Sequence, residues 1–160
     1  MSGNGPDPRS RNRRPRRRVP VSRAPVTEYE EQQELEASRE RNDLDISDLR
    51  EMSVTELRQV GRDLQLEPGS ADRREDLVDR ILQRQTERAG HAYASGILDI
   101  VDEGFGFMRR HGLLPSPDDV YVSSSQVRRF GLRIGDRISG AVRAPREAEK
   151  YWGMLRVDAD

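Results

Sequence analysis

The spacing of the apolar residues changes near residue 90, and this change most constrains what the chain can fold into. Before it, apolar residues recur at the three- and four-residue intervals of one helix face. After it, they lie in short alternating runs between glycine, proline and aspartate, which is typical of strands and turns. The sequence therefore predicts an α+β chain in which a helical part precedes a β part.

The helical part is expected over residues 46–90, beginning with a short turn near residues 47–52. Ser53 and Glu56 have the spacing of a capping box, in which each side chain binds the backbone N–H of the other residue. The helix that follows carries its apolar residues on one stripe, made of Val54, Leu57, Val60 and Leu64. These features predict a helix that begins directly after Ser53.

A second helix is expected after the break at residues 68–70, with Asp72 and Glu75 suggesting its cap. Its apolar stripe consists of Leu77, Val78, Ile81 and Leu82. A core this small is marginal alone, so we expect the subdomain to lean on a neighbour. Such units resemble SAP-like modules, and arginines on its surface would permit contact with phosphates. Acidic residues are just as numerous, so packing is the favoured role and phosphate contact the alternative.

The β part is expected over residues 94–158. Five short apolar runs have the length of strands, and residues 125–130 suit one helical turn between the third and fourth of them. The expected strands are residues 95–101, 105–109, 119–123, 138–142 and 151–157. Five strands with a helical turn in the middle predict a small OB-type barrel.

The tetrapeptide Gly104-Phe105-Gly106-Phe107 lies on the second of these strands. Strand alternation places Phe105, Phe107 and Arg109 on one face and Met108 on the other. Aromatic rings on an open β face beside an arginine form a stacking platform for unpaired bases. The alternative is that both phenylalanines belong to the core and Met108 is exposed. Stacking is favoured for Phe107, and both interpretations stay open for Phe105.

Charge is strongly segregated along the chain, although the net charge is only -1. Residues 1–25 carry eight arginines against one acidic residue, together with five prolines, which predicts a disordered basic tail. This tail either neutralises RNA phosphates or is simply solvated. Residues 26–45 are acidic and have few apolar side chains, so we expect an undocked linker, with an exposed helix as the alternative.

Several function classes are excluded by composition. The chain has no cysteine, which excludes disulfides and thiolate metal sites, and its two histidines, His91 and His111, are too far apart for a helical metal motif. Of its 28 basic residues only Lys150 is a lysine, and no Walker-A glycines precede it. We therefore expect a non-catalytic chain without metal or cofactor. No apolar run reaches the length of a membrane span, so the cytoplasm is the expected location.

Five motifs in the β part occur in an order that resembles a known family. They are Gly-Phe-Gly-Phe-Met-Arg at 104–109, Pro-Asp-Asp-Val-Tyr-Val-Ser at 117–123, Ser-Gln-Val-Arg-Arg-Phe at 125–130, Leu-Arg-Ile-Gly-Asp at 132–136 and Glu-Lys-Tyr at 149–151. Together they resemble the N-terminal RNA-binding domain of bacterial transcription termination factor Rho. The resemblance extends from about residue 47 to residue 158 and implies a helical subdomain followed by a cold-shock-like OB barrel.

This resemblance also implies a site for single-stranded, C-rich RNA, the loading site of Rho-type termination. By the family's pattern Phe107 and Tyr121 stack on bases with Phe105 beside them, while Arg109 and Asp119 bind the edge of a cytosine. Glu149, Lys150 and Tyr151 match the edge of the second base pocket, and Arg146 matches the adjacent backbone contact. The alternative for Arg146 and Lys150 is that both are simply solvated in a loop. Lys150 departs from the arginine usual at its position, so a single ammonium replaces a bidentate group there.

The absence of a P-loop separates this sequence from the motor of Rho. We expect either a piece of a longer Rho or a separate protein that retains the RNA-binding half. A rival hypothesis is an interaction or decoy protein that binds RNA polymerase or a Rho hexamer, or competes for RNA. A nuclease using Asp118 and Asp119 is disfavoured, because neighbouring strand residues point to opposite faces.

Overall fold

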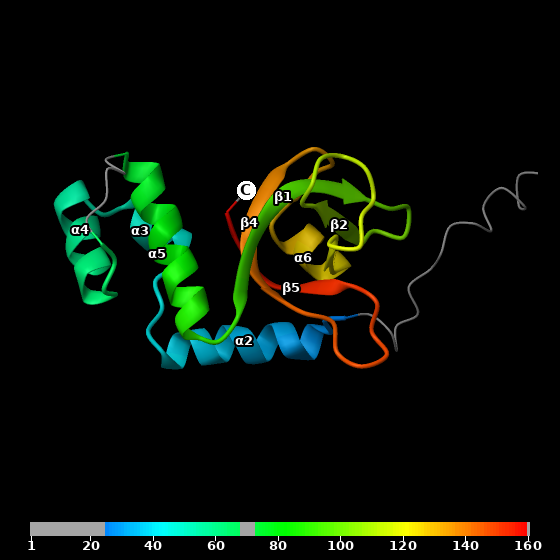
Figure 1. The fold of residues 1–160 in the computed structure, drawn as a ribbon, viewed down its shortest axis with the longest axis horizontal. Coiled ribbons are helices and arrows are strands. Elements are labelled where there is room, and N and C mark those ends of the chain that lie inside the picture. The colour runs from blue at the N-terminus through cyan, green and yellow to red at the C-terminus, as the bar shows by residue number, and fades with distance from the viewer. Residues whose placement is uncertain (1–24, 68–72, 160) are drawn as a thin grey trace, which may run out of the picture.

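The computed structural model describes residues 25–67 and 73–159, and it consists of four helices beside a closed five-stranded barrel that holds a fifth helix. Figure 1 shows α3, α4 and α5 grouped at one side of the barrel, with α2 running beneath both parts. The helices are α2 Glu28–Glu40, α3 Ile46–Arg50, α4 Val54–Asp63, α5 Arg74–Arg88 and α6 Ser124–Arg129. The strands are β1 Ala92–Ile100, β2 Gly106–Arg109, β3 Val120–Val122, β4 Arg137–Arg143 and β5 Trp152–Ala159.

The helical subdomain forms as its caps and stripes predict. Ser53 and Glu56 make the expected reciprocal capping box at the start of α4, and Asp45 makes a second one with Asp48 at the start of α3. Helix α5 begins after Arg73, which provides no side-chain capping bond. The predicted cap residue Asp72 and the break at residues 68–70 lie outside the described residues.

The core of this subdomain continues onto the barrel, as its small size predicts. Its fully buried members are Leu49, Leu57, Ile81 and Leu82, and Tyr93 of β1 packs against the same cluster. Burial raises the pKa of Tyr93 to about 12, and its hydroxyl donates to Ser139 Oγ of β4 at 3.0 Å. The subdomain is therefore attached to the barrel through β1.

The barrel closes in the order β1-β2-β3-β5-β4, as the predicted OB architecture requires. All neighbouring strands are antiparallel except β3 and β5, which pair in parallel between Val120 and Trp152. Met108, Val120 and Val122 are completely buried inside, so the alternative with Met108 exposed was wrong. None of the helices in residues 25–67 and 73–159 is long and apolar enough to cross a bilayer.

The segment before the helical subdomain differs from the favoured prediction of an undocked linker. Residues 28–40 form α2, which lies against β5 and buries the carboxylates of Glu31 and Glu34. Just before the helix, Val26 is buried against Ala141 and Leu155, and a Cβ at Gly153 would collide with it. The prediction failed because polar contacts, rather than an apolar stripe, hold most of this helix in place. The predicted basic tail, apart from the buried Pro25, lies outside the described residues.

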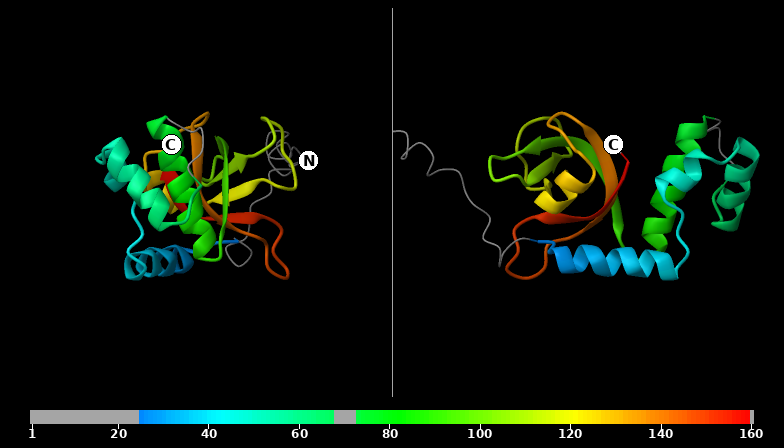
Figure 2. Two further views of the ribbon diagram at one scale, coloured as in Figure 1. Left: turned by 60° about the vertical axis from the view of Figure 1, so that its left-hand side comes forward. Right: turned by 180° about the vertical axis from the view of Figure 1, so that it is seen from behind.

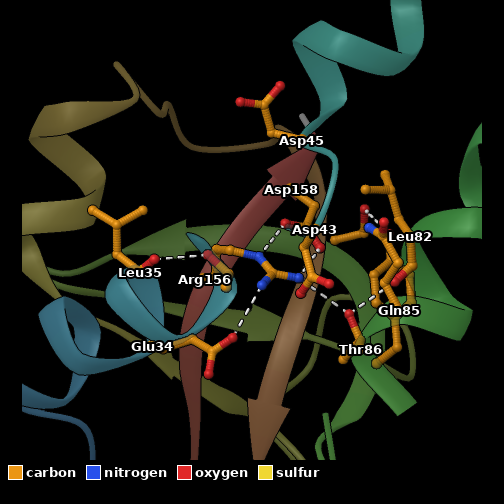
Figure 3. A network of polar contacts seen from close by, with 12 residues as sticks. Glu34, Leu35, Asp43, Asp45, Leu82, Gln85, Thr86, Arg156 and Asp158 are labelled. Atoms are coloured by element: carbon orange, nitrogen blue, oxygen red, sulfur yellow. Dashed lines mark hydrogen bonds and ion pairs between the residues drawn. The ribbon is translucent and has the colours of Figure 1, made fainter. Parts of the chain in front are cut away.

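A network around Arg156 joins α2, the barrel and α5 (Figure 3). The Arg156 guanidinium of β5 donates to Glu34 of α2 at 3.1 Å, to Thr86 of α5 at 3.2 Å and to Asp158 at 2.5 Å. Glu34 also accepts from Arg41 at 2.8 Å and lies 2.9 Å from His91 Nε2. One half-buried arginine thus joins three parts of the molecule.

Candidate nucleic-acid interface

Four aromatic rings meet on the outside of the barrel where β2, β3 and the start of β5 lie side by side. Strand register places Phe107 directly opposite Tyr121, and their ring centroids are 6.3 Å apart. The Phe105 ring lies 5.7 Å from Phe107 and 5.4 Å from Tyr121, and the Tyr151 ring approaches Phe107 to 4.9 Å. Residues far apart in the chain therefore form one aromatic cluster.

The rings differ in how much surface they offer. Phe105 and Tyr121 are each 9% exposed, whereas Phe107 and Tyr151 are half-buried. Phe105 meets Phe107 edge to face at 77°, a favourable geometry for an aromatic pair. The buried rings of Phe105 and Tyr121 thus support the cluster from below. The rings of Phe107 and Tyr151 are the ones accessible to a ligand.

Beside the rings, Arg109 forms an ion pair with each of two carboxylates. Its Nη1 donates to Asp119 Oδ2, and its Nη2 donates to Asp99 Oδ2 at 2.9 Å. The backbone N–H of Ser116 donates to the same oxygen of Asp119 at 3.1 Å. Burial lowers the pKa of Arg109, but its hydrogen bonds to Asp99 and Asp119 outweigh this and raise that pKa above its usual value. The guanidinium therefore stays charged and fixed in place 5.5 Å from the Phe107 ring centroid.

The Arg109–Asp119 pair leaves two polar atoms unsatisfied. Arg109 Nε and Asp119 Oδ1 are buried without a hydrogen-bond partner, and the Asp119 residue is only 2% exposed. A buried donor and acceptor without partners are costly and uncommon in folded proteins. They mark this pair as the place where a ligand with its own donors and acceptors would gain most.

A second group of polar residues lies in the turn before β5. Arg143 Nη1 and Nη2 donate to the two oxygens of Glu149 at 2.7 and 3.1 Å. The backbone N–H of Arg146 also donates to Glu149, at 2.8 Å. Burial raises the pKa of Glu149, but these bonds outweigh it and hold that pKa below 4.5. Lys150 Nζ lies 5.7 Å from the Tyr151 ring centroid, and Arg146 is 64% exposed. Arg146 and Lys150 are thus the outward-facing cations of this group.

The predicted site residues therefore fall into two adjoining groups. Phe105, Phe107, Arg109, Asp119 and Tyr121 form the first, and Arg146, Glu149, Lys150 and Tyr151 form the second, with the Phe107–Tyr151 ring contact joining them. The sequence did not single out three further members: Asp99, Arg143 and Glu30. Asp99 could have been found from strand alternation once β1 is paired with β2, because it lies opposite Phe107. Nothing local indicates that Glu30 of α2 reaches Arg143, which is 113 residues away.

The described residues do not form a metal-binding cluster. Asp118 lies 2.9 Å from His111 Nε2, while Asp119 is paired with Arg109, so the two neighbouring carboxylates have separate partners. No group of three or more potential metal ligands occurs within residues 25–67 and 73–159. These carboxylates are arranged as hydrogen-bond acceptors.

Comparison with known proteins identifies relatives of both parts of the chain. The family described as "Rho termination factor, RNA-binding domain" matches residues 94–159, and "Rho termination factor, N-terminal domain" matches residues 48–90. Transcription termination factor Rho of Thermotoga maritima is 43% identical over 124 residues, which are 76% of this chain and 29% of that protein. Rho of Escherichia coli K12 is 38% identical over 117 residues, which are 72% of this chain and 28% of that protein. The chain thus spans less than a third of the length of these relatives.

Proposed function

Since this chain belongs to the Rho termination factors, with the family's N-terminal domain at residues 48–90 and its RNA-binding domain at residues 94–159, we propose that the barrel captures single-stranded RNA and prefers cytosine. RNA binding in transcription termination is the function of this family region. The observation that carries the cytosine preference is the buried Arg109–Asp119 pair beside Phe107.

Stacking provides the first part of the affinity. A base would lie on the half-buried ring of Phe107, with Tyr151 beside it, and the buried rings of Phe105 and Tyr121 would keep that surface rigid. Stacking of a base on an aromatic side chain contributes about 1–3 kcal/mol and tolerates any base. Selectivity must therefore come from the polar groups.

The polar groups complement cytosine better than uracil. Cytosine presents an N4 amino donor next to its N3 and O2 acceptors, so a carboxylate and a guanidinium can satisfy the whole edge. Uracil would place its O4 carbonyl against the Asp119 carboxylate and lose that bond. The unpaired Asp119 Oδ1 and Arg109 Nε support this assignment, because each lacks a partner in the free protein.

A second nucleotide would occupy the neighbouring group of residues. Glu149 and Tyr151 would contact its base, while Arg146 and Lys150 would lie near the backbone phosphates. The bonds from Arg143 to Glu149 hold this carboxylate in one orientation and ionised, which suits an acceptor for an amino group. Together the two groups of site residues would load RNA in the bacterial cytoplasm.

The test is fluorescence anisotropy of labelled oligo-C, oligo-U and oligo-A RNA with this chain. We expect the tightest binding to oligo-C, and a loss of about tenfold or more in Phe107→Ala, because one base loses its stacking surface. Phe130→Ala is the matched control, since Phe130 is an exposed phenylalanine outside both groups of site residues. Equal affinity for the three RNAs, or equal losses in the two variants, would contradict the proposal.

A further inference from the structure

A groove of about 470 Å³ lies between α2 and the barrel, next to the proposed RNA site but outside it. Figures 1 and 2 show the β4–β5 connection beside the start of α2, and Arg146 of this connection is one of the residues that line the groove. The residues that matter for its chemistry are Tyr29, Gln33, His91, Arg143, Arg146 and Leu155. A volume in this range is typical of sites that hold a small ligand or one unit of a polymer.

The groove is continuous with the proposed second nucleotide position. Arg143 and Arg146 line the groove, and both also bind Glu149 on the other side. Glu30 of α2 bridges them, accepting from Arg143 at 2.9 Å and from Arg146 at 3.3 Å. RNA that leaves the Glu149–Tyr151 position past Arg146 would therefore enter this groove.

The wall formed by α2 presents a ring and an amide. Tyr29 is 70% exposed, and its hydroxyl accepts a hydrogen bond from Gln33 Nε2 at 2.9 Å. Residues four positions apart lie on the same helix face, so Gln33 holds the Tyr29 side chain at the groove. An exposed aromatic ring beside an amide can stack a base and also bind its polar edge.

The acidic residues of the groove do not oppose a phosphate, because arginines already neutralise them. Glu30 is paired with Arg143 and Arg146, and Glu34 is paired with Arg41 and Arg156. The guanidinium of Arg146 donates to Glu30 through Nη1 only and is mostly exposed. Its remaining N–H groups can therefore bind a phosphate without breaking the bond to Glu30.

We propose that this groove is a third RNA subsite, which takes the nucleotide next to the two on the barrel. Its base stacks on Tyr29 and hydrogen-bonds with Gln33, and its phosphate binds Arg146. The subsite rests on the proposed function, since it continues the same RNA strand. It accepts any base, because a tyrosine ring and an amide that is both donor and acceptor discriminate little. Helix α2 precedes both matched family regions, so it would lengthen the RNA path of the barrel.

The experiment compares short and long RNAs on the full chain. Affinities for oligo-C of two, four and six nucleotides are measured with the wild type, Tyr29→Ala, Gln33→Ala and Tyr29→Phe. We expect Tyr29→Ala to bind the dinucleotide as the wild type does and to bind the longer RNAs about fivefold or more weakly. Tyr29→Phe keeps the ring and should retain most of the gain with length. Gln32→Ala, on the same helix but outside the groove, is the matched control.

Two results would overturn the subsite. The first is that Tyr29→Ala and Gln33→Ala bind the longer RNAs as tightly as Gln32→Ala does. The second is an equal loss for dinucleotide and hexanucleotide, which would show a general effect on the barrel. The proposed function is tested separately by Phe107→Ala, which must weaken even the dinucleotide. An unchanged dinucleotide affinity in Phe107→Ala would contradict the barrel site and the subsite together.

Discussion

At the scale of single residues, Phe107 is the centre of the candidate interface. Tyr121 lies opposite it across the strands, Tyr151 touches it from the start of β5, and Arg109 lies against its ring. Because Met108 is buried inside the barrel, the backbone cannot turn Phe107 inward without exposing a core residue. The ring is therefore presented to a ligand before any ligand arrives, which lowers the entropy cost of binding.

The role of Asp119 is tested by Asp119→Asn. We expect the affinity for oligo-C to fall about tenfold or more, since the amide places a donor beside the amino group of cytosine. The affinity for oligo-U should change less, so the ratio of the two affinities approaches one. Anisotropy with both RNAs measures that ratio.

Asp118→Asn is the matched control, because it removes the same charge from an exposed neighbour that is bound to His111. It should leave the ratio unchanged. If Asp119→Asn lowered both affinities by the same factor, Asp119 would only support Arg109 and would not read the base.

At the scale of secondary-structure elements, α2 is held mainly by charge. Glu30, Glu31 and Glu34 face the barrel, where they bind Arg143, Ser125 and Arg156. Burial raises the pKa of Glu34, but hydrogen bonds from His91 and Arg41 outweigh this and lower that pKa below 4.5. The ionised form of Glu34 is thus favoured by folding, and its contribution to stability depends on pH.

The pH dependence follows from the direction of this shift. A carboxyl whose folded pKa is lowered stabilises the fold above its unfolded pKa, and this contribution is lost as pH falls through the folded value. Glu34→Gln should therefore lower the free energy of unfolding by about 1.5–3 kcal/mol at pH 5–7, with the difference shrinking below pH 4.5. Urea denaturation of both proteins across this range measures it.

Two other acidic residues help to interpret the experiment. Burial raises the pKa of Asp158 and the charge of Glu34 adds to this rise, so Asp158 has the opposite effect on stability and its own shift becomes smaller in Glu34→Gln. Glu36→Gln changes the charge of an exposed residue on the same helix and should have almost no effect. A constant difference between wild type and Glu34→Gln down to pH 3 would rule out ionisation of Glu34 as its source.

Local patterns predicted most of these elements. The capping box at Ser53, the strand alternation around Met108 and the helical turn at residues 125–130 each depend on neighbours within a few positions. The docking of α2 depends on pairs such as Glu30–Arg143, which join distant parts of the chain and leave no periodic signal. The same limit applies to Asp99, whose place opposite Phe107 depends on strand register.

At the scale of the whole molecule, the net charge says little, because positive and negative residues are concentrated in different segments. The net charge of -1 conceals eight arginines in residues 1–25. On the described part of the chain, most arginines of the interface are paired with carboxylates, so the barrel would bind RNA largely through stacking and hydrogen bonds. We therefore expect the N-terminal arginines to be the main source of any salt-dependent affinity.

This division predicts two different salt responses. Replacing Arg16, Arg17 and Arg18 with alanine should make the slope of log affinity against log salt less negative by about 2, because three phosphate contacts on a single strand are lost. Phe107→Ala should lower the affinity by a similar factor at every salt concentration. Titrations between about 50 and 200 mM salt measure the slope for the triple variant and for Phe107→Ala. Parallel slopes for the triple variant and the wild type would show that these arginines do not contact RNA.

The parallel pairing of β3 with β5 has a consequence for how the protein is made. The β2–β3 pairing brings Phe107 and Tyr121 together, but Tyr151 joins them only when β5 pairs with β3 and closes the barrel, and β5 is the final strand of the described chain. A ribosome must therefore release residues beyond 152 before the barrel surface is complete. We therefore expect the complete stacking surface of the barrel to appear only late in synthesis, when β5 adds Tyr151 to the rings of β2 and β3.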